Sequence, residues 1–267
     1  MNQQSKVAVI GAGVMGEALI AALISSGVNP DRITISEKRE ERAQELISKY
    51  LIKAAPLTSN VADADALLLV VKPQDMASVL AEIKGSINPT SVVVTFAAGK
   101  TISFISNGLG TGNPVVRVMP NTPTLVAQGM AAASMGAGVT PAQREFVLGF
   151  LGATGKVIEV PEDLQDAVTA TSGSGPAYFF AFVEAMVAGA KELGLSDQDA
   201  TTLTIQTIVG AAKLLDESGK SATTLRENVT SPNGTTAAAL ASFGNDNLNS
   251  MVAKAMKAAR DRSQELA

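Results

Sequence analysis

The sequence contains neither cysteine nor histidine. The lack of cysteine excludes disulfide bonds and thiolate chemistry, and nothing in the composition points to secretion. The lack of histidine removes the commonest general acid–base group and the commonest transition-metal ligand of proteins. We therefore expect no metal site, and any catalysis by this chain must rely on other groups.

Long apolar runs are also lacking. No stretch reaches about 18 uninterrupted apolar residues, so we expect no membrane span. The first residues, MNQQSKVAVIGAG, have no apolar segment preceded by positive charge and do not resemble a signal peptide. The net charge of −4 argues against nucleic-acid binding as the main function. These absences favour a cytoplasmic protein with no membrane or nucleic-acid partner.

The composition is that of a globular protein, with 267 residues of which 46% are hydrophobic and 17% charged. This length allows one or two domains with a sizeable core. Before residue 161, β-branched runs alternate with helical stretches: KVAVIGAG, RITISEK, ALLLVVKP, SVVVTFAAG, PVVRVMPN and GKVIEVPE. Strands that are apolar on both faces and alternate with helices predict a parallel sheet covered on both sides.

The pattern changes after Pro161, where long Ala-, Leu- and Met-rich segments carry apolar residues at helical spacing. We predict an α/β N-terminal domain of the doubly wound Rossmann type over residues 1–161, followed by an all-α domain over residues 162–267. The expected helices 176–193 and 197–218 are apolar around much of their circumference. Such helices must be buried, within the monomer or by a partner, so we expect a dimer formed through this half.

A dinucleotide-binding fingerprint lies at VIGAGVMG. Its three glycines directly follow an expected strand and directly precede a helix, which favours a cofactor site over a Gly-rich turn without ligand. Gly11 suits the tight turn, Gly13 the approach of a pyrophosphate and Gly16 the packing of helix on strand. The helix N-terminus attracts the phosphates. We expect the cofactor on Gly11, Ala12, Gly13, Val14, Met15 and Gly16.

Glu37 ends the second expected strand. An acidic residue there binds the ribose hydroxyls and favours NAD over NADP. Lys38 and Arg39 follow at once, and either could pair with the 2′-phosphate of NADP. All three are candidate cofactor residues, and the sequence leaves the choice between NADPH and NADH open. Lys38 and Arg39 are equally compatible with a solvated, mixed-charge helix start.

Three later strand ends should line the same cleft, because ligands of doubly wound sheets bind at the carboxyl ends of the strands. Small residues and prolines at these ends let a flat nicotinamide ring lie against the backbone. Each could equally be a residue that simply ends a strand. The candidates are Val71, Lys72, Pro73, Ala97, Ala98, Gly99, Pro120 and Asn121.

Two turns in the all-α half have the composition of helix N-termini. Residues 172–176 combine serines with a proline at an early helical position, and VTSPNGTTAAAL places two hydroxyls after a Pro-Asn-Gly turn. The free N–H groups of a helix start attract an anion. Each turn is also explained as a capped helix, but two such ends in one half favour an anionic ligand.

Taken in order, VIGAGVMG, VVKP, AAGKT, RVMPNTP, DAVTATSGSGPAYFF and RENVTSPNGTTAAAL resemble the pyrroline-5-carboxylate reductase family over residues 6–266. The SGSGPAY and TSPxGTT blocks are specific to that family, whereas the glycine fingerprint is shared with many dehydrogenases. The resemblance implies reduction of 1-pyrroline-5-carboxylate to L-proline by NADPH or NADH, the last step of proline biosynthesis. It also implies a homodimer through interleaved helical domains, often assembled further into a pentamer of dimers.

The resemblance also implies residue roles. Backbone N–H groups of Asn233, Gly234 and Thr235 would hold the substrate carboxylate, and the Thr236 hydroxyl would face the imine nitrogen as the catalytic group. The neighbouring wall would be Ser174, Gly175 and Pro176, across the dimer interface or within one chain. Asn60 resembles a family residue near the adenosine. Asn233 departs from the family's glycine, and we expect the turn to survive because Asn tolerates the left-handed region.

Two alternatives remain from the sequence. A relative of the same two-domain plan could reduce another imine or a β-hydroxyacid, although such enzymes place a lysine or histidine on the long helix after the boundary. Here the only lysine of that helix is Lys191, near its far end. The other alternative is a nucleotide-sensing scaffold that has lost turnover. The glycine loop and the TSPNGTT turn are both intact, which argues against such a loss.

Overall fold

The computed structural model describes residues 4–266. The chain forms two compact units. The first unit extends to Ser174 and also includes the final segment from Ala259, and the second unit is Gly175–Ala258. The boundary between the two compact units, at Ser174, therefore lies later in the chain than the change in composition near Pro161.

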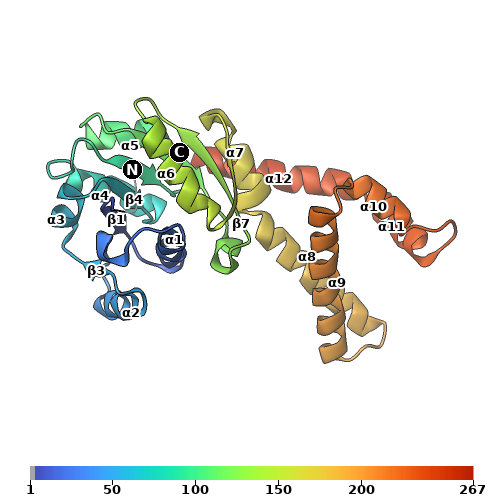
Figure 1. The fold of residues 1–267 in the computed structure, drawn as a ribbon. Helices are drawn as coiled ribbons and strands as arrows, with labels where there is room; N and C mark the ends of the chain where they lie inside the picture. The colour runs from blue at the N-terminus through green and yellow to red at the C-terminus, as the bar shows by residue number, and fades with distance from the viewer. Residues whose placement is uncertain (1–3, 267) are drawn as a thin grey trace. The chain divides into compact units, whose positions relative to one another are not determined.

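The first unit is built on one eight-stranded sheet of order β3-β2-β1-β4-β5-β6-β7-β8 (Figure 1). All neighbouring strands are parallel except β6 and β7, which are antiparallel. The strands are β1 (Val7–Ile10), β2 (Ile33–Ser36), β3 (Lys53–Ala54), β4 (Ala66–Leu69), β5 (Val92–Thr95), β6 (Val115–Met119), β7 (Gly129–Met135) and β8 (Gly155–Glu159).

The six strands expected from β-branched runs are all present, which confirms the doubly wound fold. The sequence did not reveal the two-residue strand β3 or the strand β7, whose residues GMAAASM are rich in alanine. The expected parallel sheet is confirmed, with one antiparallel step between β6 and β7 that the sequence did not indicate.

Helices cover both faces of the sheet, which explains why its central strands are apolar throughout. On β1, Val7 and Val9 pack in one cluster with Leu19 and Phe150, while Ala8 and Ile10 pack in a second cluster with helices that follow β4 and β5. The helices of this unit are α1 (Val14–Ser25), α2 (Glu40–Tyr50), α3 (Leu57–Ala62), α4 (Met76–Ile83), α5 (Ile102–Leu109) and α6 (Pro141–Gly152), with short 3-10 turns η1 (Pro30–Arg32), η2 (Pro73–Asp75) and η3 (Thr122–Val126).

After residue 161 the described chain is entirely helical, as expected. The elements are η4 (Glu162–Leu164), α7 (Gln165–Val168), the π-helical turn η5 (Thr169–Gly173), α8 (Gly175–Glu192), α9 (Asp197–Glu217), α10 (Ala222–Asn228), α11 (Thr235–Asn245) and α12 (Leu248–Glu265). Among residues 4–266, no helix has the length and apolar character needed to cross a membrane.

The end of α12 completes the first unit. Ser263 is buried, and its Oγ donates a hydrogen bond of 2.7 Å to Asp166 of α7. Asp166 also lies 3.5 Å from the guanidinium of Arg117, which is buried in β6. Nζ of Lys100, in the turn after β5, donates to the carbonyl of Leu266 at 3.0 Å. Residues distant in sequence therefore close this unit.

Candidate functional site

The carboxyl ends of the parallel strands meet at one edge of the sheet. Ile10 pairs in register with Leu69 and with Ser36, and Leu69 pairs with Thr95. The glycine loop, the segment 70–73 and the segment 96–99 therefore leave the sheet side by side. This edge is where a doubly wound sheet binds its ligands, and it brings together most of the predicted cofactor residues.

Each glycine of the fingerprint has a different steric environment. Gly11 has φ +87°, and a Cβ there would lie 2.9 Å from the carbonyl oxygen of Val70. A Cβ at Gly16 would lie 2.4 Å from the carbonyl oxygen of Gly11, so only glycine allows this helix start. A Cβ at Gly13 would meet no atom of the described residues within 4 Å, which leaves open space where the pyrophosphate is predicted.

The N-terminus of α1 has no side-chain cap from the described part of the chain. Its N-cap is Gly13, and Val14 at its first position is 65% exposed. The first N–H groups of a helix have no intrahelical partners, and they carry the positive end of the helix dipole. This end of α1 can therefore accept phosphate oxygens at the glycine loop.

Glu37 and Arg39 form one unit rather than two competing groups. The carboxylate of Glu37 accepts hydrogen bonds of 3.0 Å from the Ala12 N–H, the Arg39 N–H and the Arg39 Nε. Burial raises the pKa of Glu37, but these hydrogen bonds outweigh burial and hold the pKa below its ordinary value. Lys38 is exposed, as the solvated interpretation expected of it.

Arg42 supports the same loop from α2, a role that the sequence did not reveal. Its Nε donates to the carbonyl of Ala12 at 3.1 Å, and its guanidinium pairs with Glu17 of α1. Ala12 is thus held on both sides, through its N–H by Glu37 and through its carbonyl by Arg42.

Glu17 collects three partners. Besides Arg42, it accepts hydrogen bonds from Lys49 Nζ at 2.9 Å and Tyr50 OH at 3.0 Å. The hydrogen bond from Lys49 is the strongest influence on Glu17 and, together with Arg42 and Tyr50, lowers its pKa to about 2 despite opposing burial. This cluster joins α1 to α2 beneath the glycine loop.

The turns after β4 and β5 lie at the same edge. The Cγ1 of Val71 lies 3.2 Å from the position of a Cβ on Gly11, so this turn contacts the glycine loop. Lys72 is exposed and precedes Pro73, the first residue of η2. Ala97 is buried and Ala98 half-buried. Gly99 has φ +73° and packs closely on Leu266.

The turn after β6 contains the buried Pro120 and Asn121. The side chain of Asn121 forms two hydrogen bonds within the protein: its Oδ1 accepts from the Met130 N–H at 2.8 Å, and its Nδ2 donates to the Ser172 carbonyl at 3.1 Å. These bonds occupy both ends of its amide.

A helix starts within residues 172–176, as expected: α8 begins at Gly175, with Pro176 in its first turn. Helix α7 continues into the π-helical turn η5, and Ser174 keeps right-handed helical angles with φ −85° and ψ −18°. The Ser174 N–H donates to the Thr169 carbonyl at 2.8 Å, five residues back. Ser174 is the bend between the π-helical turn and α8, and Pro176 follows the buried Gly175 in the first turn of α8.

The TSPNGTT turn is a helix start, as expected. Asn233 adopts φ +60°, which confirms that it tolerates the left-handed conformation. Gly234 is the N-cap of α11, and within residues 4–266 no side chain caps this end. Thr235 is exposed and Thr236 half-buried in the chain. The first N–H groups of α11 are thus available to an anion.

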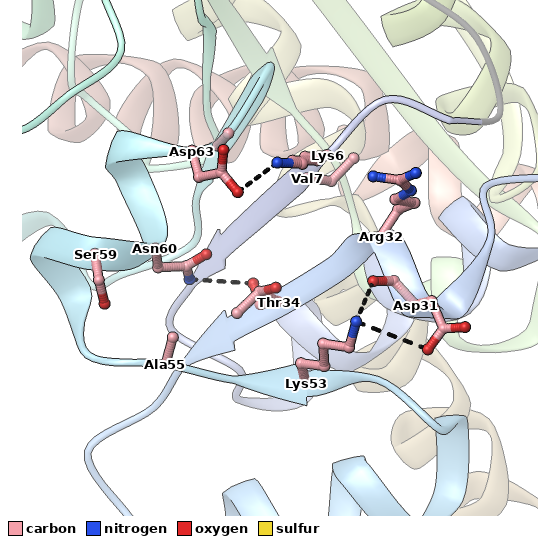
Figure 2. Close-up of a pocket in the computed structure, with 11 residues that line it drawn as sticks. Lys6, Val7, Asp31, Arg32, Thr34, Lys53, Ala55, Ser59, Asn60 and Asp63 are labelled. Carbon is pink, nitrogen blue, oxygen red and sulfur yellow. Dashed lines mark hydrogen bonds and ion pairs between the residues drawn. The ribbon is translucent and has the colours of Figure 1, made fainter.

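A cavity of about 360 Å³ lies away from this edge, among the starts of β1, β2 and β3. Figure 2 shows the residues that line it. Asn60 lines it, and its Nδ2 donates to the Thr34 carbonyl at 3.2 Å and to Ser36 Oγ at 2.9 Å. The amide of Asn60 therefore holds β2, and its contact with an adenosine stays a prediction.

Comparison with known proteins gives the family. Residues 162–266 match the family described as pyrroline-5-carboxylate reductase dimerisation, and residues 6–99 match the family described as NADP oxidoreductase coenzyme F420-dependent. The chain is 42% identical to a pyrroline-5-carboxylate reductase of Corynebacterium melassecola, with 97% of this chain and 98% of that protein covered. It is 40% identical to the enzyme of Pseudomonas aeruginosa, with coverages of 98% and 97%.

Solved structures agree. The pyrroline-5-carboxylate reductase of Coxiella burnetii superposes with a TM-score of 0.92 at 34% identity, covering 99% of both chains. The Plasmodium falciparum pyrroline carboxylate reductase, solved with NADP bound, gives 0.87 at 26% identity and covers 100% of this chain and 99% of that one. The motifs, the fold and the full-length similarity agree, and the chain belongs to the pyrroline-5-carboxylate reductase family.

Proposed function

We propose that this chain reduces 1-pyrroline-5-carboxylate to L-proline with NADPH or NADH, as the last step of proline biosynthesis. The observation that carries the proposal is the uncapped start of α11, where Asn233 at φ +60° precedes free helical N–H groups in the family's TSPxGTT block. The glycine loop is the second feature that the reaction needs, because it can bind a dinucleotide cofactor. The family relationship and the NADP-bound relative support the cofactor assignment.

In this proposal the substrate carboxylate lies on the turn Asn233–Thr235, with the N–H groups of Asn233 and Thr235 as its donors. The Gly234 N–H already donates to the Ser231 carbonyl at 3.0 Å and would be shared with the carboxylate. A carboxylate is stabilised there by the partial positive charge of the helix end. The wall beside it is formed by Ser174, Gly175 and Pro176. Nothing in this arrangement needs a cationic side chain at the carboxylate.

The Thr236 hydroxyl orients the imine nitrogen, and it is a hydrogen-bond group rather than a strong acid. The bound nicotinamide supplies the hydride that reduces the imine carbon. The imine takes its proton from water before it binds, so the nitrogen of the product keeps that proton as the C=N bond becomes single. Placing two small reactants in near-attack geometry can contribute roughly 7–11 kcal/mol, which explains how a chain without histidine can catalyse this step.

We assign the cofactor-binding roles to residues along the carboxyl edge of the sheet. Residues 11–16 hold the pyrophosphate, Glu37, Lys38 and Arg39 meet the adenosine ribose, and Asn60 lies near the adenosine. The segments 71–73, 97–99 and 120–121 surround the nicotinamide half. The open space at Gly13 and the inward Glu37 carboxylate support this direction of binding.

The dimerisation domain makes the chain an oligomer-forming protein. We propose a homodimer formed through α8 and α9, with a pentamer of dimers as the larger assembly. Exposed aromatic residues support the first step, since Phe179 is 66% and Phe180 63% exposed in the single chain. We propose that the enzyme works in the cytoplasm.

One assay tests the function. Oxidation of NADPH and of NADH is followed by absorbance with and without 1-pyrroline-5-carboxylate, and L-proline is identified as the product. Oxidation that depends on this substrate and yields proline is expected. Turnover of a β-hydroxyacid in its place would favour the hydroxyacid alternative, and cofactor binding without turnover of either would favour a scaffold.

A further inference from the structure

Pro176 lies in the first turn of α8. If α7 ran on into α8 as one regular α-helix, the N–H of residue 176 would donate to the carbonyl of Ser172, but proline has no N–H and its ring would collide with that carbonyl. The two helices are instead separated by the π-helical turn Thr169–Gly173 and the bend at Ser174. π-Helical turns inside α-helices occur frequently at functional sites.

The Ser172 carbonyl accepts a hydrogen bond from the side chain of Asn121. Nδ2 of Asn121 donates to it at 3.1 Å, and Oδ1 of the same amide accepts from Met130 of β7 at 2.8 Å. Asn121 is only 9% exposed, so it belongs to the interior rather than to a free binding surface. One side chain thus joins the end of β6, the strand β7 and the π-helical turn.

The same strand carries a second buried asparagine at its other end. Asn113 lies before β6, is 5% exposed, and donates through Nδ2 to the carbonyls of Asn88 and Ser91, both at 2.9 Å. Its bonds hold loops at the starts of the strands, away from the ligand-binding edge. Asn113 is therefore a matched control for a buried asparagine whose bonds do not reach the π-helical turn.

We propose that Asn121 is a positioning residue for substrate: it fixes the π-helical turn and so places Ser174 and Gly175, without its side-chain amide contacting the cofactor. This inference rests on the proposed function for its kinetic consequence. It differs from the role that the sequence suggested for Asn121, because both ends of the amide are already bonded within the protein.

The first test compares Asn121→Ala with Asn113→Ala in the full-length protein. Both should lower Tm, because each leaves buried backbone groups unpaired. Only Asn121→Ala should lower kcat/KM for 1-pyrroline-5-carboxylate, by about tenfold or more relative to Asn113→Ala, while the Kd of NADPH stays within twofold of the parent. Equal kinetics in the two variants would overturn the inference, and so would a large rise in the NADPH Kd of Asn121→Ala alone.

A second test isolates the hydrogen bond. Pro176→Ala restores an N–H that can reach the Ser172 carbonyl, so the kinetic loss caused by Asn121→Ala should shrink in that background. An undiminished loss would show that this bond is not the cause.

Amide hydrogen exchange tests the role of Asn121 independently of the proposed catalytic function. Peptides covering residues 165–178 should exchange faster in Asn121→Ala than in Asn113→Ala, whether or not the parent turns over pyrroline-5-carboxylate. If the parent lacks turnover, the proposed function fails while exchange still decides the role of Asn121. Unchanged exchange in Asn121→Ala would overturn the inference.

Discussion

In the first unit every residue of β1, β4 and β5 is buried, whereas in the second unit α8 buries only Gly175, and α10 and α11 bury no residue. The second unit is nevertheless rich in apolar side chains. The first unit therefore buries its apolar side chains within itself, while the apolar faces of the helices in the second unit need another surface to cover them. The difference separates a self-sufficient nucleotide-binding fold from a helical half whose apolar faces are left for a partner to cover.

The largest effect should come from a charge on the exposed face of α8. Phe179→Asp should abolish the dimer at low micromolar concentration, because a desolvated carboxylate opposes burial of this face. Light scattering measures the mass. The matched control is Leu51→Asp in the first unit, where a 75% exposed leucine should be replaceable without loss of assembly. If the parent protein is a stable monomer of 27.3 kDa, the second unit does not need a partner and the contrast between the two units fails.

A second test addresses the turn before α11. Asn233→Pro should reduce substrate affinity by well over tenfold, because proline fixes φ near −65° where the chain needs +60° and removes an N–H at the anion site. Asn233→Gly is the control, since glycine adopts this conformation freely and is the family's usual residue. Steady-state KM for pyrroline-5-carboxylate measures the effect. If both variants behave like the parent, the turn is only a helix start.

Thr236→Ala should have a smaller effect. Loss of one neutral hydrogen bond corresponds to about 0.5–1.5 kcal/mol, or roughly a two- to tenfold fall in kcat/KM. The Kd of NADPH should not change, and Thr235→Ala provides a neighbouring hydroxyl for comparison. A loss well above tenfold would mean that the bond strengthens in the transition state, and no loss would remove Thr236 from the mechanism.

Cofactor choice should respond to the Glu37–Arg39 pair. Glu37→Ser removes repulsion of the 2′-phosphate and frees Arg39, so the NADPH/NADH ratio of kcat/KM should rise roughly tenfold. Arg39→Ala should weaken NADPH and leave NADH nearly unchanged. Lys38→Ala, which changes an exposed neighbour, is the control. Identical ratios in all three variants would show that this loop does not read the cofactor.

The smallest effect concerns pH and is confined to the first unit. Glu17 has a folded pKa of about 2 against 4.5 without its partners, so its stabilisation is complete above about pH 4.5 and is lost as the pH falls toward 2. Glu17→Gln should lower the free energy of unfolding by ~1–2 kcal/mol at pH 7 after allowance for solvent screening, and by little at pH 2. Denaturant titrations at both pH values, with the exposed Glu82→Gln as control, measure this difference. A pH-independent loss would contradict it.

Local sequence predicted the elements whose conformation is locally determined. The Val- and Ile-rich strands and the glycine loop fall in this class, because each residue type suits one backbone arrangement. Strand β7 escaped detection because alanine favours helix in isolation, and only pairing with β6 and β8 makes it a strand.

The contacts that support the candidate site could not be read locally. Arg42 reaches Ala12 across 30 residues, and Asn121 reaches Ser172 across 51. The start of α8 was predicted, because serine, glycine and proline are common at a helix N-terminus. The π-helical turn just before it was not, because its bond to Asn121 comes from a distant part of the chain.

The bond between Ser263 and Asp166 has a consequence for synthesis on the ribosome. It joins residues 97 positions apart, and the contact of Lys100 with Leu266 spans 166. A nascent chain can pair its strands early, since domains fold as units while translation proceeds. These closing contacts form only after the whole intervening segment has emerged. The final step of folding in the nucleotide-binding unit therefore awaits translation of residues 259–266, and chains halted before Ala259 would leave the ribosome without those contacts.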